Sequence, residues 1–450
     1  MPRKVKLPEN FRPDDTKLWE KKHPEPIKAE YRLVTPLYGG GEKVNRADSV
    51  STIRVSSIKG QLRFWWRAIR GWQAQGDLKR MLELEEVIWG GVSKVKQSSR
   101  AELMVEVISP ETPDEITHIS ARAVPRYVAF PLLQGTSDED KKEALSKDIH
   151  FRLTIYIHPM LQEKNDEKKH DTYFTEKALK EEVEAAKWAW ETFGGIGART
   201  RRGFGALEAA VQSLEDIQKG LQKYSHPNTE AWPQNIPHLT TNSNVAVLDR
   251  SWESIIDLYQ RFRQYRPDVK TIWHKGKEKQ VPGPNKWPEA TLLRWAYAPR
   301  RYNKPDLRVA PRVQFGLPVP FFFLQDNKLG NKGKMIFTGK RRPKEDRIDR
   351  LASPLIIRPL SKQKTLIAIL EGPHTPPGDV FLDPPPIAEE LLGKPINTDL
   401  SPEEAKELIK AGLKVLEVNG QVYTNPVLAF LKCVQDKSCV QLLLKVHTGR

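Results

Sequence analysis

The stretch GGIGARTRRGFGAL, residues 194–207, places five glycines and three arginines within fourteen positions. Glycine reaches positive φ angles without strain and lets the backbone approach a ligand closely. The arginines between the glycines supply planar cations that suit phosphate. We therefore predict a loop that wraps the backbone phosphates of a single nucleic-acid strand; the alternative is a plain tight turn. A Walker or Rossmann loop is excluded, because no G-K-[ST] follows and no Rossmann strand precedes it.

Regular elements surround this loop. A helix is predicted from Thr175 to Phe193, because its apolar residues recur at helical spacing and two glycines follow it. A last strand is expected from Phe204 to Val211. Earlier strands are expected at residues 31–34, 101–108 and 151–157, the last two from alternating apolar residues. With the helix described next, the order is β-α-β-β-α-β, the ferredoxin-like arrangement.

The first helix of this unit is SSIKGQLRFWWRAIRGW, residues 56–72, with Ser57 as its expected N-cap. Its arginines Arg63, Arg67 and Arg70 share one face. A neighbouring apolar stripe should be buried, and it consists of Ile58, Leu62, Trp65, Ile69 and Trp72. Residues 54–70 contain five cations and no acid, so the arginines cannot form ion pairs within the helix.

Phosphate is therefore the expected partner of these arginines, and acidic residues of another domain are the alternative. Arg54, Lys59 and Gly60 belong to the same candidate surface. Backbone N–H groups in the first turn of a helix are free and favour an anion. The predicted RNA-binding residues of the glycine-rich loop are Gly194, Gly195, Gly197, Arg199, Arg201, Arg202, Gly203 and Gly205.

The rest of the chain is predicted to repeat this pattern. Residues 221–244 are polar and proline-bearing and are expected to form a linker. Strands are expected at 245–248, 354–357, 365–370 and 439–446, and helices at 251–264 (capped by Ser251), 402–413 and 426–433. We interpret the chain as an α+β protein with two tandem ferredoxin-like (β-α-β-β-α-β, RRM-like) domains carrying long insertions. The domains span residues 1–220 and 245–450, and the second is divergent.

The composition favours a soluble protein with a polyanionic partner. The net charge is +16, and each phosphate that is neutralised releases counterions. The sequence contains no apolar run long enough for a membrane span and no secretory signal at its start, so we expect a cytoplasmic protein. Cys433 and Cys439 could form a disulfide, but two unrelated buried thiols are the favoured interpretation.

Several stretches together resemble the RAMP superfamily of CRISPR-associated RNA-binding proteins, whose hallmark is a glycine-rich loop before the last strand. TPLYGGG (35–41), IRVSSIKGQLRFWWRAIRG (53–71) and GGIGARTRRGFG (194–205) look like the large, two-domain first subunit of the Cmr-type (type III-B) effector complex. FGLPVPF (315–321) and LASPLIIRPL (351–360) are similar to the second half of that subunit. The resemblance implies an antiviral-defence protein that binds guide RNA (crRNA) near its 3′ end, beside other RAMP subunits. The resemblance also implies that the protein supports recognition of target RNA and is not the subunit that cleaves it.

Two other functions stay open. A metal-independent endoribonuclease that processes guide RNA would need a general base, usually histidine, yet neither RNA-binding stretch contains one. His158 is expected to be structural, and His170-Asp171 lacks ligand partners at useful spacing. A scaffold that touches no RNA conflicts with the arginine row. We predict no catalytic residue, no metal and no cofactor.

Basic residues also gather between the two predicted domains. They occur in residues 332–350 and in a cluster formed by Arg300, Arg301, Lys304, Arg308 and Arg312 around Tyr302. Such runs are usually solvated loops, but basic residues beside an aromatic ring also suit single-stranded RNA.

Overall fold

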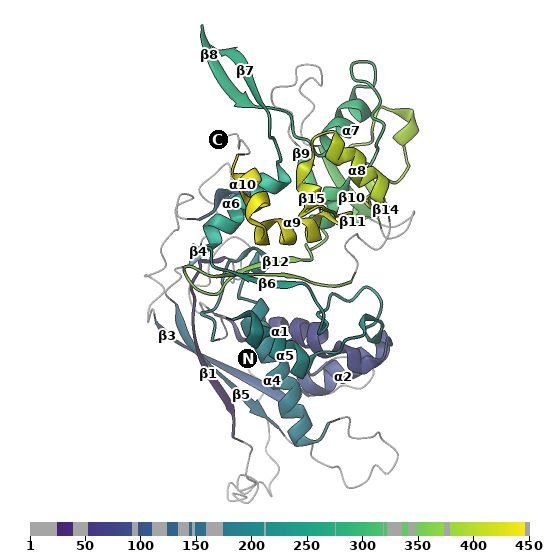
Figure 1. Ribbon diagram of the computed structural model, residues 1–450. Coiled ribbons are helices and arrows are strands. Elements are labelled where there is room, and N and C mark those ends of the chain that lie inside the picture. Colours follow the sequence, from purple (N-terminus) through teal and green to yellow (C-terminus); the bar gives the residue numbers. More distant parts are fainter. Residues whose placement is uncertain are drawn as a thin grey trace, which may run out of the picture.

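The computed structural model describes residues 25–38, 53–91, 98–109, 124–133, 144–145, 149–158, 174–210, 213–274, 276–317, 319–321, 335–340, 347–348, 350–372 and 379–445. We call residues 25–210 the first half and residues 213–445 the second half. In Figure 1 most of the first half lies below most of the second, but residues 214–224 of the second half pack into the core of the first. No helix in these described ranges has the length and apolar character of a membrane span.

The structure is mixed α+β with several small antiparallel sheets. The α-helices are α1 (Val55–Arg70), α2 (Leu78–Trp89), α3 (Arg126–Leu133), α4 (Glu176–Phe193), α5 (Leu214–Tyr224), α6 (Trp252–Arg263), α7 (Pro288–Tyr297), α8 (Pro402–Lys410), α9 (Pro426–Gln435) and α10 (Lys437–Leu444). The first eight strands are β1 (Ile27–Arg32), β2 (Leu37–Tyr38), β3 (Ala101–Ser109), β4 (Ala144–Leu145), β5 (His150–Ile157), β6 (Val245–Leu248), β7 (Val269–His274) and β8 (Lys277–Pro282). The others are β9 (Val319–Phe321), β10 (Met335–Lys340), β11 (Arg347–Ile348), β12 (Leu355–Pro359), β13 (Thr365–Ile369), β14 (Asp379–Asp383), β15 (Glu417–Val418) and β16 (Gln421–Val422).

The first half is built on an antiparallel sheet with the strand order β1-β5-β3. Alternate residues of these strands enter a core that α1 and α4 also line. The helix predicted at 175–193 is confirmed as α4, which Thr175 caps by accepting a hydrogen bond from the Ala178 amide at 3.2 Å. The N-cap of α1 is Arg54, so the expected Ser57 cap is wrong and Ser57 lies inside the first turn.

The strand expected at 204–211 is reduced to a single bridge between Leu33 and Leu207. The Val34 amide donates to the Ala206 carbonyl at 2.9 Å, so residue 206 lies on the side of the first strand segment that faces away from β5. Gly203 and Gly205 have φ angles of +89° and +60°, which extended strands do not adopt. The segment therefore occupies the position of a fourth strand without forming one.

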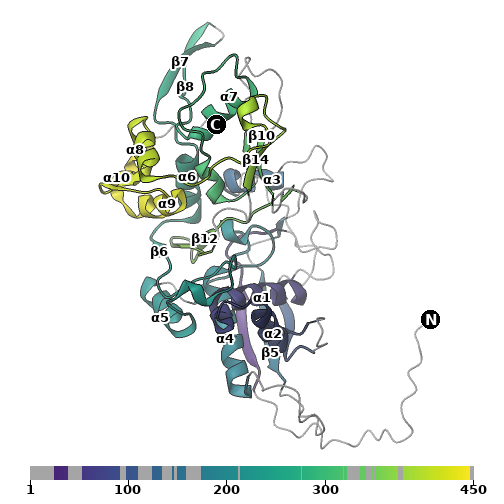
Figure 2. The same cartoon turned by 90° about the vertical axis from the view of Figure 1, so that its right-hand side faces the viewer.

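A three-stranded sheet of the second half, β12-β13-β6, lies at its boundary with the first half (Figures 1 and 2). Every residue of β12 and β13 is buried. Ile356, Leu366 and Ala368 belong to the first core. Leu355, Ile357, Ile367 and Ile369 point to the other side, into the second core. This sheet is thus shared by both cores.

The C-terminal strand predicted at 439–446 is wrong, because residues 437–444 form the helix α10. Asp436 caps it by accepting a hydrogen bond from the Cys439 amide at 2.7 Å, and Cys439, Val440 and Leu443 are buried at helical spacing. Cys433 and Cys439 form a disulfide between α9 and α10, with Cα atoms 5.1 Å apart. The expectation of two unrelated thiols is therefore also wrong.

The predicted linker packs along α1. The Trp232 indole N–H donates to the Arg67 carbonyl at 3.0 Å, and the Leu239 amide donates to the Ala68 carbonyl at 3.0 Å. Trp232 and Leu239 are both buried. Residues 221–244 connect the halves, and they also cover the C-terminal part of α1.

Candidate nucleic-acid interface

Two arginines of α1 share one carboxylate. Glu85 of α2 lies with its side chain only 2% exposed, and it accepts from Arg63 Nε at 2.5 Å and from Arg67 Nη1 at 2.7 and 2.9 Å. The two arginine side chains remain 31% and 32% exposed. The two guanidinium groups and the carboxylate together carry one net positive charge. The buried Glu85 also fixes the position of both guanidinium groups.

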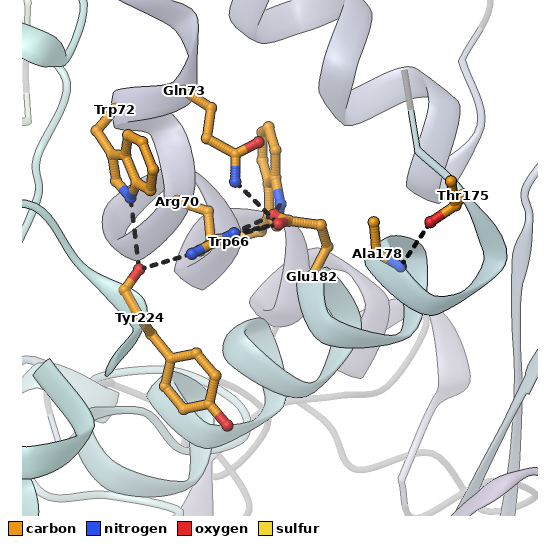
Figure 3. Close-up of polar contacts among 8 residues, drawn as sticks. All are labelled: Trp66, Arg70, Trp72, Gln73, Thr175, Ala178, Glu182 and Tyr224. Atoms are coloured by element: carbon orange, nitrogen blue, oxygen red, sulfur yellow. Dashed lines mark hydrogen bonds and ion pairs between the residues drawn. The ribbon is translucent and has the colours of Figure 1, made fainter. Parts of the chain in front are cut away.

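Arg70, the third member of the predicted row, is bound inside the protein (Figure 3). Both oxygens of Glu182 on α4 accept from Arg70 Nε at 3.0 Å, and Arg70 Nη2 also donates to this carboxylate. Trp66 Nε1 donates to the same carboxylate at 2.9 Å and Gln73 Nε2 at 2.8 Å. The Arg70 side chain is only 16% exposed. The expectation that Arg70 faces an external phosphate is therefore wrong.

The carboxylates that hold this row lie within the first half, and not in another domain as the alternative interpretation supposed. Glu182 follows Leu179 by three positions and precedes Ala186 by four, so it lies on the edge of the apolar stripe of α4. An acidic residue at such a position signals a buried ion pair. That signal was available in the sequence.

The buried stripe of α1 is confirmed at Ile58, Leu62, Trp65 and Ile69. Trp65 stacks on Phe193 of α4, with ring centroids 5.8 Å apart. Trp72 lies beyond the end of α1 and is half-buried, stacked on His226. Trp66 is fully buried although it was not assigned to the stripe.

The start of α1 remains open at the surface. Gly60 is exposed, and a methyl group added to it would meet no atom within 4 Å. Lys59 Nζ donates to Ser99 Oγ at 3.1 Å. Burial, and then the charge of nearby Arg63, lower the pKa of Lys59. Lys59, Arg63 and Arg67 are spaced four residues apart on α1, so they lie along one side of the helix and form one cationic strip.

Four of the five glycines of residues 194–205 are required by contacts inside the protein. A Cβ on Gly205 would lie 1.9 Å from the Ile196 carbonyl oxygen, and one on Gly195 would lie 2.7 Å from the Gly205 carbonyl oxygen. A Cβ on Gly194 would lie 2.5 Å from Trp65 Nε1, and one on Gly203 would lie 2.4 Å from Trp252 Nε1. The loop is thus folded tightly on itself, on α1 and on α6.

The three arginines of this loop donate to backbone carbonyls elsewhere in the chain. Arg199 Nη1 donates to Val128 at 2.8 Å, Arg201 Nη1 to Ser353 at 2.5 Å and Arg202 Nη1 to Leu355 at 2.6 Å. Arg202 also donates to the Tyr259 hydroxyl at 3.1 Å. Burial, and then the adjacent Arg202 charge, lower the pKa of Arg201 to about 10. Arg201 and Arg202 therefore bind the second half, which the prediction of a loop around phosphates did not anticipate.

Arg358 of β12 makes the reverse connection and was not identified from the sequence. It is fully buried, and it donates from Nε to the Gly194 carbonyl and from Nη2 to the Leu207 carbonyl, both at 3.0 Å. Burial lowers the pKa of Arg358 to about 10. The two ends of the glycine-rich loop are thus held by one guanidinium group from the shared sheet.

The basic cluster predicted at residues 300–312 is divided in the structure. Lys304 and Arg308 both pair with Glu390. Arg312 is buried, and its Nε donates to Glu289 at 3.0 Å. The basic stretch 332–350 is described only in part, because the structure leaves out residues 332–334, 341–346 and 349. His170 and Asp171 also lie outside the described residues.

Comparison with known proteins finds a family model that matches part of the first half. Residues 30–208 match the model of the RAMP superfamily. The chain is 24% identical over 269 residues to the CRISPR system Cmr subunit Cmr1-1 of Pyrococcus furiosus, covering 59% of this chain and 70% of that one. It is 24% identical over 194 residues to Cmr1-2 of the same organism, covering 42% of this chain and 96% of that one.

Solved structures of similar proteins were also found. The crystal structure of Cmr1 from Pyrococcus furiosus in its apo form aligns with a TM-score of 0.43 at 15% identity, over 77% of this chain and 88% of that one. A chain of the type III-B Cmr-beta complex bound to cognate target RNA, solved by electron cryomicroscopy, aligns with a TM-score of 0.40 at 12% identity, over 86% of this chain and 98% of that one.

Proposed function

We propose that this chain is a non-catalytic RNA-binding subunit of a type III-B (Cmr) effector complex. Two similarities support this: residues 30–208 match the RAMP superfamily model, and the chain is similar to Cmr1 subunits. In this proposal it contacts crRNA near its 3′ end, beside other RAMP subunits, and supports recognition of target single-stranded RNA. The observation that carries the RNA contact is the pair Arg63 and Arg67 on the single carboxylate of Glu85. We also propose that both halves are variants of the ferredoxin-like fold.

The electrostatics of α1 support this proposal. Arg63 and Arg67 keep about a third of their surface exposed after pairing, so their remaining N–H groups can donate to phosphate oxygens. Guanidinium groups that a buried carboxylate already positions lose little conformational entropy when they bind a second anion. Lys59 adds a third cation one turn before Arg63. The net charge of +16 adds long-range attraction for a polyanion.

The predicted RNA-binding residues divide into two groups under this proposal. The contacting group lies on the half-exposed or exposed surface and consists of Arg54, Lys59, Gly60, Arg63, Arg67, Gly197 and Arg199, of which Arg199 also donates to the Val128 carbonyl. The positioning group is engaged inside the protein and consists of Arg70, Gly194, Gly195, Arg201, Arg202, Gly203 and Gly205.

The proposal assigns no cleavage chemistry to the chain. Neither α1 nor the glycine-rich loop contains a histidine. His158 Nε2 lies 2.8 Å from a carboxylate oxygen of exposed Glu102 on the sheet surface, remote in sequence from both stretches. We therefore expect labelled guide RNA to remain intact when it is incubated with the purified chain.

An RNA titration over a salt series tests the proposal. We expect the full chain to bind single-stranded RNA with little sequence preference, and log affinity to fall linearly with log salt between about 50 and 200 mM. Arg67→Gln should make the salt slope shallower by about 0.7 if one phosphate contact is lost. Fluorescence anisotropy of a labelled RNA measures both quantities.

Arg152→Gln is the matched control, because Arg152 is 41% exposed and lies between Glu30 and Glu106 on the outer face of the sheet. It should leave the salt slope unchanged. Binding that does not depend on salt, or an equal effect of the two substitutions, would contradict the proposed role of Arg67.

A further inference from the structure

The strands β7 and β8 form a ribbon that projects from the second half. They pair antiparallel from Val269 with Pro282 to His274 with Lys277. Within the described part of the chain, neither strand joins another sheet. Figures 1 and 2 show the ribbon extending away from the body in both views. An isolated two-stranded ribbon is at best marginally stable in water, so a binding partner would stabilise it.

The register gives the ribbon two different faces. Side chains alternate along a strand, and directly paired residues share a face. Val269, Thr271 and Trp273 therefore lie on one face, together with Glu278 and Gln280. The opposite face carries Lys270, Lys277 and Lys279.

Both faces are exposed to an unusual degree. Trp273 is 73% exposed and Val269 is 41% exposed, although Trp is a residue that proteins largely bury. Lys270, Lys277 and Lys279 are exposed, and no ion pair to any of them occurs among the described residues. Glu278 of β8 is the one acidic residue of the two strands, and it lies on the tryptophan face.

We propose that the β7–β8 ribbon binds single-stranded RNA, with a base stacked on Trp273 and phosphates on the face of Lys270, Lys277 and Lys279. This inference rests on the proposed RNA-binding function and extends it to the second half. An indole ring is a platform for any base, and base stacking together with lysine-bound phosphates is the usual way to hold a single strand without reading its sequence. Glu278 favours a base over a phosphate on the tryptophan face, because a carboxylate repels phosphate.

RNA suits this ribbon better than a protein surface. A protein partner would have to bury an indole on one face and neutralise three lysines on the other. A nucleotide strand presents a flat ring and an anionic backbone within each repeating unit. It can therefore satisfy both faces as it passes over the ribbon.

The test uses the full-length chain and a fluorescein-labelled oligouridine, titrated by anisotropy at several salt concentrations. Trp273→Ala should weaken binding about 5- to 150-fold, the range expected for loss of one stacked base. Trp273→Tyr should retain most of the affinity. Combined Lys270→Gln, Lys277→Gln and Lys279→Gln should make the salt slope shallower by about 2 units. Leu392→Ala is the control, because Leu392 is a 55% exposed apolar residue that belongs to neither β7 nor β8.

The outcomes separate this inference from the proposed function. If the unaltered chain does not bind RNA, the proposed function and this inference both fail. If it binds and the ribbon variants bind equally well with unchanged salt slopes, only the ribbon inference fails. If Trp273→Ala leaves RNA binding intact but prevents association with other Cmr subunits, the ribbon is a protein-docking element and the inference is overturned. Thermal melting should give the same Tm for every variant, because the altered side chains are exposed.

Discussion

At the scale of single residues, the carboxylate of Glu182 connects three side chains of the first half. It accepts hydrogen bonds from Trp66, Arg70 and Gln73, and its side chain is 3% exposed. Glu182→Ala would leave the Arg70 guanidinium in the protein without its counter-charge. We expect a loss of about 3–5 kcal/mol in the free energy of unfolding, measured by chemical denaturation.

Glu181→Ala is the matched control, because Glu181 is the adjacent residue of α4 and its side chain is exposed. It should change stability by no more than about 0.5 kcal/mol. Equal losses for Glu181→Ala and Glu182→Ala would show that the internal network contributes little.

His238 should make stability depend on pH. It is 4% exposed, stacks on Trp232, and lies with Nδ1 2.7 Å from the Ile236 carbonyl and Nε2 2.5 Å from Thr229 Oγ1. Burial lowers the pKa of His238, opposed by the Ile236 hydrogen bond and the charge of Glu371.

The unfolded chain therefore binds a proton on His238 at a higher pH than the folded chain does. This contribution to stability is complete above about pH 6.5 and is lost as the pH falls below that value toward the lowered pKa of the folded state. His238→Gln should remove this part of the pH dependence. Denaturation curves of both proteins between about pH 5 and pH 8 measure the difference, and parallel stability profiles would contradict it.

The sequence predicts which residues of α1 are buried better than it predicts what they contact. Spacing alone identifies Ile58, Leu62, Trp65 and Ile69, because a helix turns by a fixed angle per residue. It does not identify the partners of Arg67 and Arg70. Glu85 is 18 residues from Arg67, and Glu182 is 112 residues from Arg70, so tertiary packing brings them together.

At the scale of elements, two glycines with different surroundings provide a matched test. Gly205→Ala would place a methyl carbon 1.9 Å from the Ile196 carbonyl oxygen at a φ of +60°. We expect a loss of about 3 kcal/mol or more. Gly60→Ala meets no atom within 4 Å and lies inside α1, so it should stabilise the chain by about 0.5–1 kcal/mol. Thermal and chemical denaturation of both variants measures these two changes in stability. Equal changes for Gly205→Ala and Gly60→Ala would contradict the prediction.

Elements with strong periodicity and a side-chain cap could be predicted from the sequence. Helix α6 begins after Ser251, whose hydroxyl accepts from the Ser254 amide, as expected. The run CVQLLL in α10 was misassigned because short apolar segments fit a strand and a buried helix equally well. Asp436 settles the choice by capping α10, and the disulfide to α9 places it against that helix.

At the scale of the whole molecule, Arg358 should couple the stability of the two halves. Arg358→Met keeps an unbranched, mostly apolar side chain but removes the N–H groups that donate to the Gly194 and Leu207 carbonyls. We expect a loss of about 2–4 kcal/mol, measured by denaturant unfolding. Arg358→Lys should recover part of it, because an ammonium group can reach one carbonyl.

Calorimetry should show one unfolding transition for both the unaltered chain and Arg358→Met, because the β12-β13-β6 sheet still belongs to both cores. Two separated transitions in the unaltered chain would mean that the halves unfold independently.

This sharing could not be predicted from the sequence. The sequence predicts apolar strands at residues 354–357 and 365–370, which the structure shows as β12 and β13. A strand buried on both faces has no alternating pattern, so nothing in it tells which core each face completes. A tandem arrangement of separate domains was the simplest interpretation of such runs, and it omits the contacts that cross between the halves.

Because the first core includes residues of the shared sheet, it cannot be completed during synthesis until that sheet has been made. The first core contains Ile356, Leu366, Ala368 and Leu370 together with residues of the first half. These side chains leave the ribosome about 160 residues after the glycine-rich loop, which at about 5–20 residues per second is a delay on the order of 10–30 s. Throughout that interval the nascent first half presents an uncovered apolar surface. We expect ribosome-bound chains that stop before β12 to be held by chaperones, and chains that extend past β13 to be released.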